Sequence, residues 1–276
     1  MKLKKTIIGV VVVGLLISCA TNPFTGKKTM AFVSNDQLFP MSFQQYNQVK
    51  SENKVITGTS DAQMITRVGE RIAIAAERWL NANGHEGYLN DYKWEYSLIE
   101  SEQVNAWCMP GGKIAFYTGI LPIAQNETGI AAIMGHEVAH ALANHGQQRM
   151  SSGMLQQLGA GAVAVATSKE SAENQQLWMQ AYGAASTVGG VLPFSRGHET
   201  EADKIGLYLM AIAGYNPDEA AELWKRMKAN SGGNAPPEFL STHPSNDSRI
   251  ATLQELAPTA KAEARKFGVN SFRPIN

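Results

Sequence analysis

The segment His136-Glu137-Val138-Ala139-His140 constrains this chain more than any other stretch of its sequence. Residues four apart lie on the same face of an α-helix, about 6 Å apart along its axis. Two imidazoles at that spacing can bind one zinc ion, so His136 and His140 are the first candidate ligands. The carboxylate of Glu137 can then reach a water at the metal and take a proton from it. The motif therefore predicts a helix that carries a catalytic zinc site.

The sequence around the motif favours a helix. Asn126 is a good N-cap residue, and Gly146 is the predicted end. Apolar residues recur between them at helical spacing, at Ile130, Ile133, Met134, Val138, Ala141 and Leu142. The pattern H-E-x-x-H is typical of zinc proteases, but it is short enough to occur by chance in a purely structural helix. His145 is not favoured as a further ligand, because motifs with a third histidine place it one residue later.

A third ligand is needed, because a catalytic zinc usually has three protein ligands and one open position. The best source is Glu199-Thr200-Glu201-Ala202-Asp203, at the start of a helix predicted over 199–213. Glu199 and Asp203 would share one face of that helix. Glu199 can bind the metal while Asp203 accepts a hydrogen bond from the far nitrogen of a ligand histidine. Glu201 is the alternative ligand, but no aspartate follows it at that spacing.

The remaining pattern predicts an α+β fold that is mostly helical. Ser60 is expected to cap a helix that ends at Gly84. Three strands are predicted, over 94–98, 104–109 and 113–117, the last two joined by a turn at Pro110-Gly111-Gly112. They indicate a small antiparallel sheet packed on the helix of the motif. Residues 155–194 read as two helices joined by a loop, a hairpin that packs on the core or covers the site in preference to entering a membrane.

The N-terminus has the features of a lipoprotein signal peptide. Lys2, Lys4 and Lys5 precede an apolar run over 7–17, which is too short to span a bilayer comfortably. The run ends at Leu16-Ile17-Ser18-Cys19, which resembles a lipobox, so Cys19 is the predicted lipidation site. The predicted organisation is a signal peptide over 1–18, a tether with a peripheral helix over 19–58, and a catalytic domain over 59–276. Ala20, in place of an aspartate, predicts the outer membrane, facing the periplasm.

Charge and cysteine content limit the partners. The sequence has 24 basic and 24 acidic residues, so loss of the three lysines of the signal peptide would leave 21 basic residues. No basic patch indicates nucleic-acid binding, and no feature indicates an oligomeric state. With Cys19 lipidated, Cys108 has no second cysteine to pair with and is expected to be buried in a strand.

Four segments give the chain a specific family resemblance. They are Asn105-Ala106 through Pro110-Gly111-Gly112, His136 to His140, Arg196 through Asp203, and Ser241-Thr242-His243-Pro244-Ser245 with Arg249. In this order they resemble the zinc metalloendopeptidases of the HtpX and CaaX-prenyl-protease family, in its soluble lipoprotein branch. The resemblance implies a thermolysin-like gluzincin core with one Zn²⁺ per chain.

The resemblance also implies roles for residues outside the motif. Asn105 and Ala106 would lie on the strand edge that pairs with an extended protein or peptide substrate. His243 would lie near the zinc, where it would either stabilise the transition state or cap the metal in a latent enzyme. Arg196 and Arg249 would form supporting ion pairs. Substrates would be unfolded or misassembled envelope proteins.

These features predict a lipid-anchored zinc endopeptidase of the cell envelope that acts in protein quality control. The alternative is a zinc-containing chaperone-like or binding lipoprotein whose site is permanently capped, with His243 as a fourth ligand.

Overall fold

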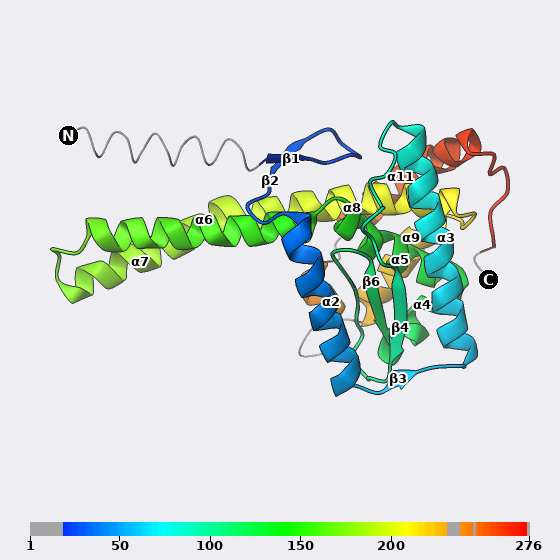
Figure 1. Cartoon of the computed structure of the whole chain (residues 1–276), viewed down its shortest axis with the longest axis horizontal. Coiled ribbons are helices and arrows are strands. Elements are labelled where there is room, and N and C mark those ends of the chain that lie inside the picture. The colour runs from blue at the N-terminus through cyan, green and yellow to red at the C-terminus, as the bar shows by residue number, and fades with distance from the viewer. Residues whose placement is uncertain (1–18, 231–237, 245–246, 275–276) are drawn as a thin grey trace. The chain divides into compact units, whose positions relative to one another are not determined.

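The computed structural model describes residues 19–230, 238–244 and 247–274 (Figure 1). The predicted signal peptide lies outside the described residues, as does the Gly/Pro-rich segment 231–237. The chain divides into two compact units. One, here called the hairpin unit, comprises the described residues up to Leu38 together with Asn144–His198. The other, the site unit, comprises Phe39–Ala143 and the described residues from Glu199 onward.

The sheet of the site unit has four strands in the order β3-β4-β6-β5. Their bounds are Val55–Ile56 for β3, Glu95–Ile99 for β4, Ala106–Met109 for β5 and Lys113–Tyr117 for β6. The pairs β3–β4 and β5–β6 are antiparallel, whereas β4 and β6 are parallel. The predicted α+β class is therefore confirmed, and the sheet is mixed because the β5–β6 hairpin folds back to place β6 beside β4.

Helices cover both faces of this sheet (Figure 1). On one face lies α2 (Asn35–Glu52), whose Tyr46 is fully buried and donates a hydrogen bond of 2.8 Å to Ser97 Oγ. On the other face, α3 (Ser60–Ala82) packs against β4, and α5 (Glu127–Leu142) packs against β5 and α3. The helix of the motif thus lies in the core, beside α3 on the same face of the sheet.

The rest of the site unit is helical. A 3₁₀ turn and a short helix precede α5, and four helices follow in the second half of the chain. Their bounds are η1 Thr118–Ile120, α4 Leu121–Ala124, α8 Leu192–Ile212, α9 Asp218–Asn230, α10 Glu238–Thr242 and α11 Asp247–Lys266. The part of α8 from Glu199 onward belongs to the site unit.

The hairpin unit contains the two helices that the sequence predicts, α6 (His145–Ala166) and α7 (Ala172–Ser186), with a π-turn η2 at Thr187–Val191. A short antiparallel pair, β1 (Cys19–Thr21) and β2 (Lys28–Met30), completes it. Tyr182 OH donates to the Gln156 carbonyl at 3.1 Å and holds α7 against α6. Within the part of the chain that the structure describes, no helix combines the length and apolar character needed to cross a bilayer.

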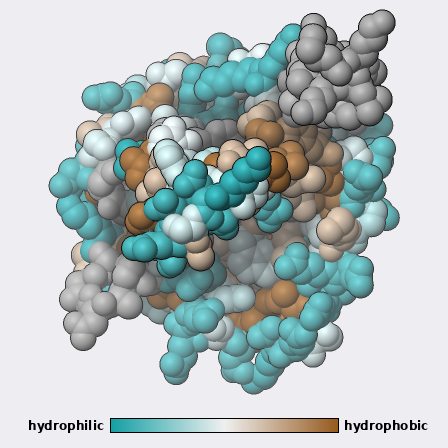
Figure 2. Space-filling model, turned by 90° about the vertical axis from the view of Figure 1, so that its left-hand side faces the viewer, coloured by the Kyte–Doolittle hydropathy of each residue, from teal (hydrophilic) through white to brown (hydrophobic). Residues whose placement is uncertain are grey.

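Large apolar side chains remain exposed along the hairpin. They include Met150, Met154, Leu158 and Val165 of α6, Leu177, Trp178 and Met179 of α7, and Val188, Val191 and Leu192 after it. Figure 2 views the molecule from the side of the turn between α6 and α7 and shows hydrophobic residues scattered among hydrophilic ones. No residue of α7 is buried. Among the described residues, α7 therefore adds no buried side chain to a core.

Several helix boundaries differ from the sequence predictions, including the start of α6, which lies at His145 and not at residue 155. Thr59 caps α3 in place of Ser60, and its hydroxyl accepts a hydrogen bond from the Ala62 amide. The prediction that the motif helix ends at Gly146 was wrong: α5 ends at Leu142 because Asn144 adopts a left-handed conformation with φ 56°. The helix predicted to begin at Glu199 begins at Leu192. Side-chain caps and asparagine conformations are local choices that composition alone does not settle.

Candidate metal centre

Helix α5 presents the three motif residues from a buried position. The Asn126 side chain accepts a hydrogen bond of 2.9 Å from the Gly129 amide and so caps the helix start. Every residue from Thr128 to Leu142 is buried. His136, Glu137 and His140 are therefore held by packing on all sides, which restricts their rotamers and directs them at one point.

Helix α8 approaches α5 backbone to backbone. A Cβ atom on Gly135 would lie 2.8 Å from the Gly206 carbonyl oxygen, and one on Gly206 would lie 2.8 Å from the His136 amide nitrogen. Neither position accommodates a side chain without movement. This close crossing brings Glu199 and Asp203 of α8 to the two histidines, and the sequence analysis did not identify it. A glycine directly before the motif was the available signal.

Four side chains of the site unit converge on one point. They belong to His136, His140, Glu199 and His243. Each offers one ligand atom, and these atoms all lie within 4.8 Å of one another. His136 Nε2 is 3.1 Å from His140 Nε2 and 3.4 Å from Glu199 Oε2, and His140 Nε2 is 3.2 Å from Glu199 Oε1. His243 Nδ1 lies 3.1 Å from His136 Nε2 and 3.0 Å from Glu199 Oε2. All four residues are buried.

These separations fit the donor set of a tetrahedral zinc site. With Zn–N and Zn–O bonds of about 2.0–2.2 Å, ligand atoms of a tetrahedron lie roughly 3.3 to 3.6 Å apart. The five distances above span 3.0 to 3.4 Å, close to those edges. Two imidazoles and a carboxylate are also the donors that zinc hydrolases use. The cluster includes Glu199, and not the alternative ligand Glu201.

Asp203 and Arg249 support the cluster from behind. Asp203 Oδ1 lies 3.0 Å from His136 Nδ1, the nitrogen that faces away from Glu199. Arg249 donates to both carboxylate oxygens of Asp203, at 2.7 and 2.8 Å, and its Nη1 lies 3.2 Å from Glu199 Oε2. A buried bidentate pair of this kind holds the carboxylate in one orientation. That orientation in turn selects the tautomer and ring position of His136.

Two aromatic side chains that the sequence did not mark as site residues pack beside the cluster. They are Trp224 of α9 and Phe239 of α10. The Arg249 guanidinium lies 3.6 Å from the centroid of the Trp224 ring, a cation–π contact. Phe239 packs on Trp224 at 5.6 Å and on His243 at 4.7 Å between ring centroids. Both residues are ordinary members of apolar helix faces in the sequence, so no motif marked them.

Charge at the cluster favours a cation. Burial alone would raise the pKa of Glu199, but hydrogen bonds with His136, His140 and His243 hold it far below its ordinary value. Burial alone would lower the pKa of His136, but hydrogen bonds with Asp203 and Glu199 raise it to about 9. Burial lowers the pKa of His140 well below its ordinary value. A metal ion would therefore displace a proton from His136, so metal affinity should fall as pH falls.

Glu137 and His243 face each other across the cluster. Glu137 Oε1 lies 3.4 Å from His243 Nε2, a separation longer than a normal hydrogen bond. Both side chains are buried, and Pro244 directly follows His243 in the chain. The two groups can therefore exchange a proton only after a small movement or through a water.

The other predicted site residues lie elsewhere. Ala106 begins β5, the edge strand of the sheet, and Asn105 precedes it. Arg196 is exposed and belongs to the hairpin unit. His145 and His198, also in that unit, are buried with their rings stacked at 4.0 Å between centroids. Cys108 lies in β5 as predicted, where it is half-buried and burial raises the pKa of its thiol.

Comparison with known proteins places the chain among metallopeptidases. The sequence model of peptidase family M48 matches residues 61–257. That span contains α5, the four residues of the cluster, and Asp203 and Arg249, which support it.

Several characterised proteins are similar to this chain. A mitochondrial metalloendopeptidase OMA1 of Schizosaccharomyces pombe is 37% identical over 177 residues, which are 63% of this chain and 50% of that protein. OMA1 of Arabidopsis thaliana is 33% identical over 69% of this chain and 39% of its own length. A β-barrel assembly-enhancing protease of Yersinia pestis is 26% identical over 92% of this chain and 52% of its own length. The chain thus spans about half the length, or less, of these relatives.

Proposed function

Because this chain belongs to peptidase family M48, we propose that it is a zinc-dependent endopeptidase with His136, His140 and Glu199 as its metal ligands. The convergence of these three donors with Glu137 beside them is the observation that carries the proposal. A buried donor set of this kind has no structural purpose that apolar packing would not serve better, because buried polar groups are costly unless they are satisfied.

The residues have separate tasks in peptide hydrolysis. Zinc, when bound, supplies a Lewis acid that lowers the pKa of a water and polarises a carbonyl. Glu137 takes the proton from that water and later delivers it to the leaving amine. Asp203 keeps His136 in the tautomer whose Nε2 is free to bind, and Arg249 keeps Asp203 in place. His243 can donate from Nε2 to the developing oxyanion when it is not held at the cluster.

The experiment that tests this function compares zinc content and cleavage of unfolded casein in three variants. Glu137→Gln should retain one zinc per chain and lose at least about 10³-fold in kcat/KM, because it removes the proton acceptor and leaves the ligands. His136→Ala should lose both zinc and activity. Glu102→Gln, an exposed carboxylate outside the cluster, is the control. Undiminished cleavage by Glu137→Gln would end the proposal.

A latent or binding role is the second candidate, and the position of His243 favours it. Its Nδ1 lies at the ligand-to-ligand distances of a fourth zinc ligand, 3.0 to 3.1 Å from Glu199 and His136. Four protein ligands would close the coordination sphere, as in structural zinc sites. Cleavage that appears only in His243→Ala would identify a latent protease. Zinc without cleavage in both wild type and variant would favour a binding lipoprotein.

The proposed substrates are extended segments of misfolded or misassembled envelope proteins. Two observations support this: similar proteins include a β-barrel assembly-enhancing protease, and β5 is a sheet edge that can pair with an added strand through Asn105 and Ala106. We propose that Cys19 carries a lipid anchor and that the protein lies at the outer membrane and faces the periplasm. It would then belong to the lipoprotein branch of the HtpX-like enzymes. Incorporation of labelled palmitate by wild type and not by Cys19→Ser would support the anchor, and equal labelling would exclude it.

A further inference from the structure

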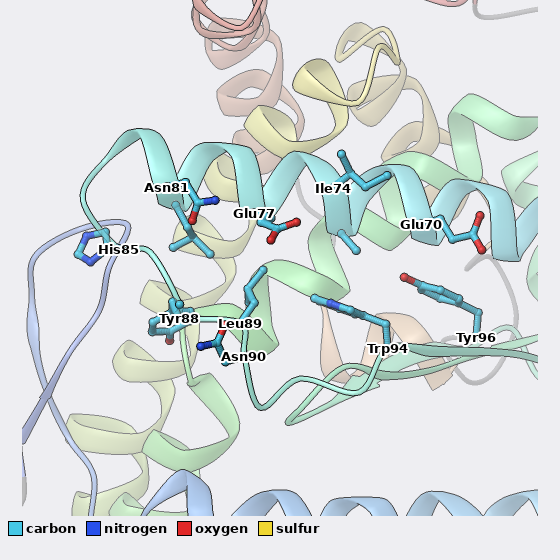
Figure 3. A pocket seen from close by; sticks show the side chains of 13 residues that line it. Glu70, Ile74, Glu77, Asn81, His85, Tyr88, Leu89, Asn90, Trp94 and Tyr96 are labelled. Atoms are coloured by element: carbon cyan, nitrogen blue, oxygen red, sulfur yellow. The ribbon is translucent and has the colours of Figure 1, made fainter.

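A cleft of the site unit lies between α3 and the segment that leads into β4 (Figure 3). Its volume is about 520 Å³. This cleft is called the α3 groove. One wall consists of Glu70, Ile74, Glu77 and Asn81, and the other consists of Trp94 and Tyr96. None of its lining residues belongs to the metal cluster. The groove is therefore separate from the proposed catalytic site.

One wall of the groove is aromatic, and each ring packs against a glycine. A Cβ atom on Gly112 would lie 2.7 Å from the Trp94 ring, and one on Gly69 of α3 would lie 2.1 Å from the Tyr96 ring. Trp94 therefore rests on the backbone at Gly112, whereas Tyr96 packs on the backbone of α3 itself, at the end of the groove near Glu70. Figure 3 shows the two rings below α3, across from its acidic side chains. The Tyr96 hydroxyl is buried and has no hydrogen-bond partner among the described residues.

The other wall carries two carboxylates. Glu70 and Glu77 are exposed, and neither forms a hydrogen bond or ion pair with another described residue. Among the described residues that line the groove there is no lysine or arginine. The two carboxylates are seven residues apart on one helix, which corresponds to about 10 Å along its axis. Ile74, 56% exposed, lies between them.

These features select the chemistry of an occupant. Carboxylates opposite aromatic faces bind guanidinium and ammonium groups, through charge and through the negative face of the ring. The aliphatic stem of an arginine or lysine would cover Ile74 while its charged end meets a carboxylate. In a polyproline II segment, side chains three residues apart lie about 9 Å apart on one face, close to the spacing of Glu70 and Glu77.

We propose that the α3 groove binds a basic, extended polypeptide segment that carries two cationic side chains about three residues apart. The groove is a second polypeptide-binding site, beyond the proposed peptidase activity, and its occupancy does not require a bound metal or a cleavage step. It selects segments by charge, whereas pairing with the β5 edge would select by backbone hydrogen bonds.

The test measures binding of a short fluorescein-labelled peptide with two arginines three residues apart, by anisotropy, to the full chain with Glu137→Gln. That substitution keeps the peptide intact, so the result does not depend on cleavage. A matched peptide with citrulline in place of both arginines keeps the shape of the side chains but removes their charge. We expect the arginine peptide to bind at least about tenfold more tightly than the citrulline peptide, and to weaken as salt rises from about 50 to about 300 mM.

Additional substitutions locate the binding. Glu70→Gln with Glu77→Gln should weaken the arginine peptide about tenfold or more, whereas Glu102→Gln, the same charge change outside the groove, should leave its affinity unaltered. Circular dichroism verifies that the variants fold. Equal affinity for the two peptides, equal affinity of the double variant and Glu102→Gln, or no saturable binding would each overturn the proposal.

Discussion

Helices α5 and α7 are similar in length and alanine content, yet they have opposite environments. They contain 16 and 15 residues, with four alanines in each. In α5 every residue from Thr128 onward is buried, whereas α7 has no buried residue. The difference lies in their surroundings: α5 is enclosed by α3, β5 and α9, while α7 packs against α6 and η2. Burial follows from the segments that pack around each helix, together with the more apolar sequence of α5.

This contrast explains where chemistry is possible. A buried helix can hold histidines and carboxylates in fixed rotamers, because neighbouring side chains exclude alternatives and water. On an exposed helix the same groups would remain solvated and mobile. The α6–α7 hairpin instead exposes apolar side chains such as Leu158 and Trp178, which a solvated helix does not need.

Removal of metal should separate the two regions most clearly. Chelation should abolish cleavage and leave four buried polar side chains at the cluster without their common partner. We expect faster amide exchange in α5 around His136–His140 and in α8 around Glu199, with exchange in α7 unchanged. Hydrogen exchange measured by mass spectrometry checks this, and added zinc should reverse it. An equal increase in α7 would contradict the separation of the two regions.

Truncation of an apolar side chain should be costly only in the buried helix. Ile130 of α5 is fully buried, and Ile130→Ala should lower the free energy of unfolding by about 2–5 kcal/mol through lost contacts and a cavity. Leu158 of α6 is 69% exposed, so Leu158→Ala should alter it by about 0.5 kcal/mol or less. Urea unfolding of both variants gives the comparison. A large loss for Leu158→Ala would mean that the hairpin packs against something in solution.

Alanine in place of glycine should have opposite signs in the two regions. A Cβ atom on Gly206 would lie 2.8 Å from the backbone of α5, so Gly206→Ala should destabilise by about 1–3 kcal/mol and reduce activity. A Cβ atom on Gly183 of α7 meets nothing within 4 Å, so Gly183→Ala should stabilise by about 0.5–1 kcal/mol through helix propensity. Thermal unfolding distinguishes these outcomes, and a neutral Gly206→Ala would show that α5 and α8 can separate at no cost.

Acidic residues at the two helix starts should differ in their pH dependence. Partial burial alone would raise the pKa of Glu127, but hydrogen bonds from Arg67 and Tyr215 lower it. A carboxylate whose pKa is lowered by folding stabilises the folded state at pH values above the unfolded pKa of about 4.3. That stabilisation is lost as the pH falls through the pKa of the folded state. Wild type should therefore lose on the order of 0.5 kcal/mol more than Glu127→Gln between neutral pH and about pH 3, after solvent screening.

The matched control for that measurement is Glu173→Gln in the first turn of α7. Glu173 is exposed and forms no hydrogen bond or ion pair with another described residue. Its substitution should leave the acid dependence of stability unaltered. An equal effect of the two substitutions would mean that the contacts of Glu127 contribute nothing specific.

The elements that the sequence predicted well are those set by local periodicity. The helix of the motif, its Asn126 cap and the hairpin β5–β6 follow from residues close together in the chain. The choice of Glu199 over Glu201 as a candidate ligand also came from a local rule, the position of Asp203 one helical turn later, and the cluster contains Glu199. Spacing along a helix determines which side chains share a face, whatever surrounds the helix.

The features that the sequence did not reveal all depend on distant segments. The parallel pairing of β4 with β6, the close approach of Gly135 to Gly206 and the ring of Trp224 beneath Arg249 join residues far apart in the chain. Nothing in the pattern around Trp224 distinguishes it from another core residue.

Residues close together in the chain establish a helix with two histidines on one face, a carboxylate between them and a second acidic helix that could supply the third donor. The packing of distant segments encloses α5 and leaves α7 exposed, brings His243 within 3.0 Å of Glu199, and places Glu70 and Glu77 in a groove with Trp94 and Tyr96. The physical reason is that local spacing sets the direction of a side chain, whereas burial, charge and distance to a partner are set by the segments that pack around it.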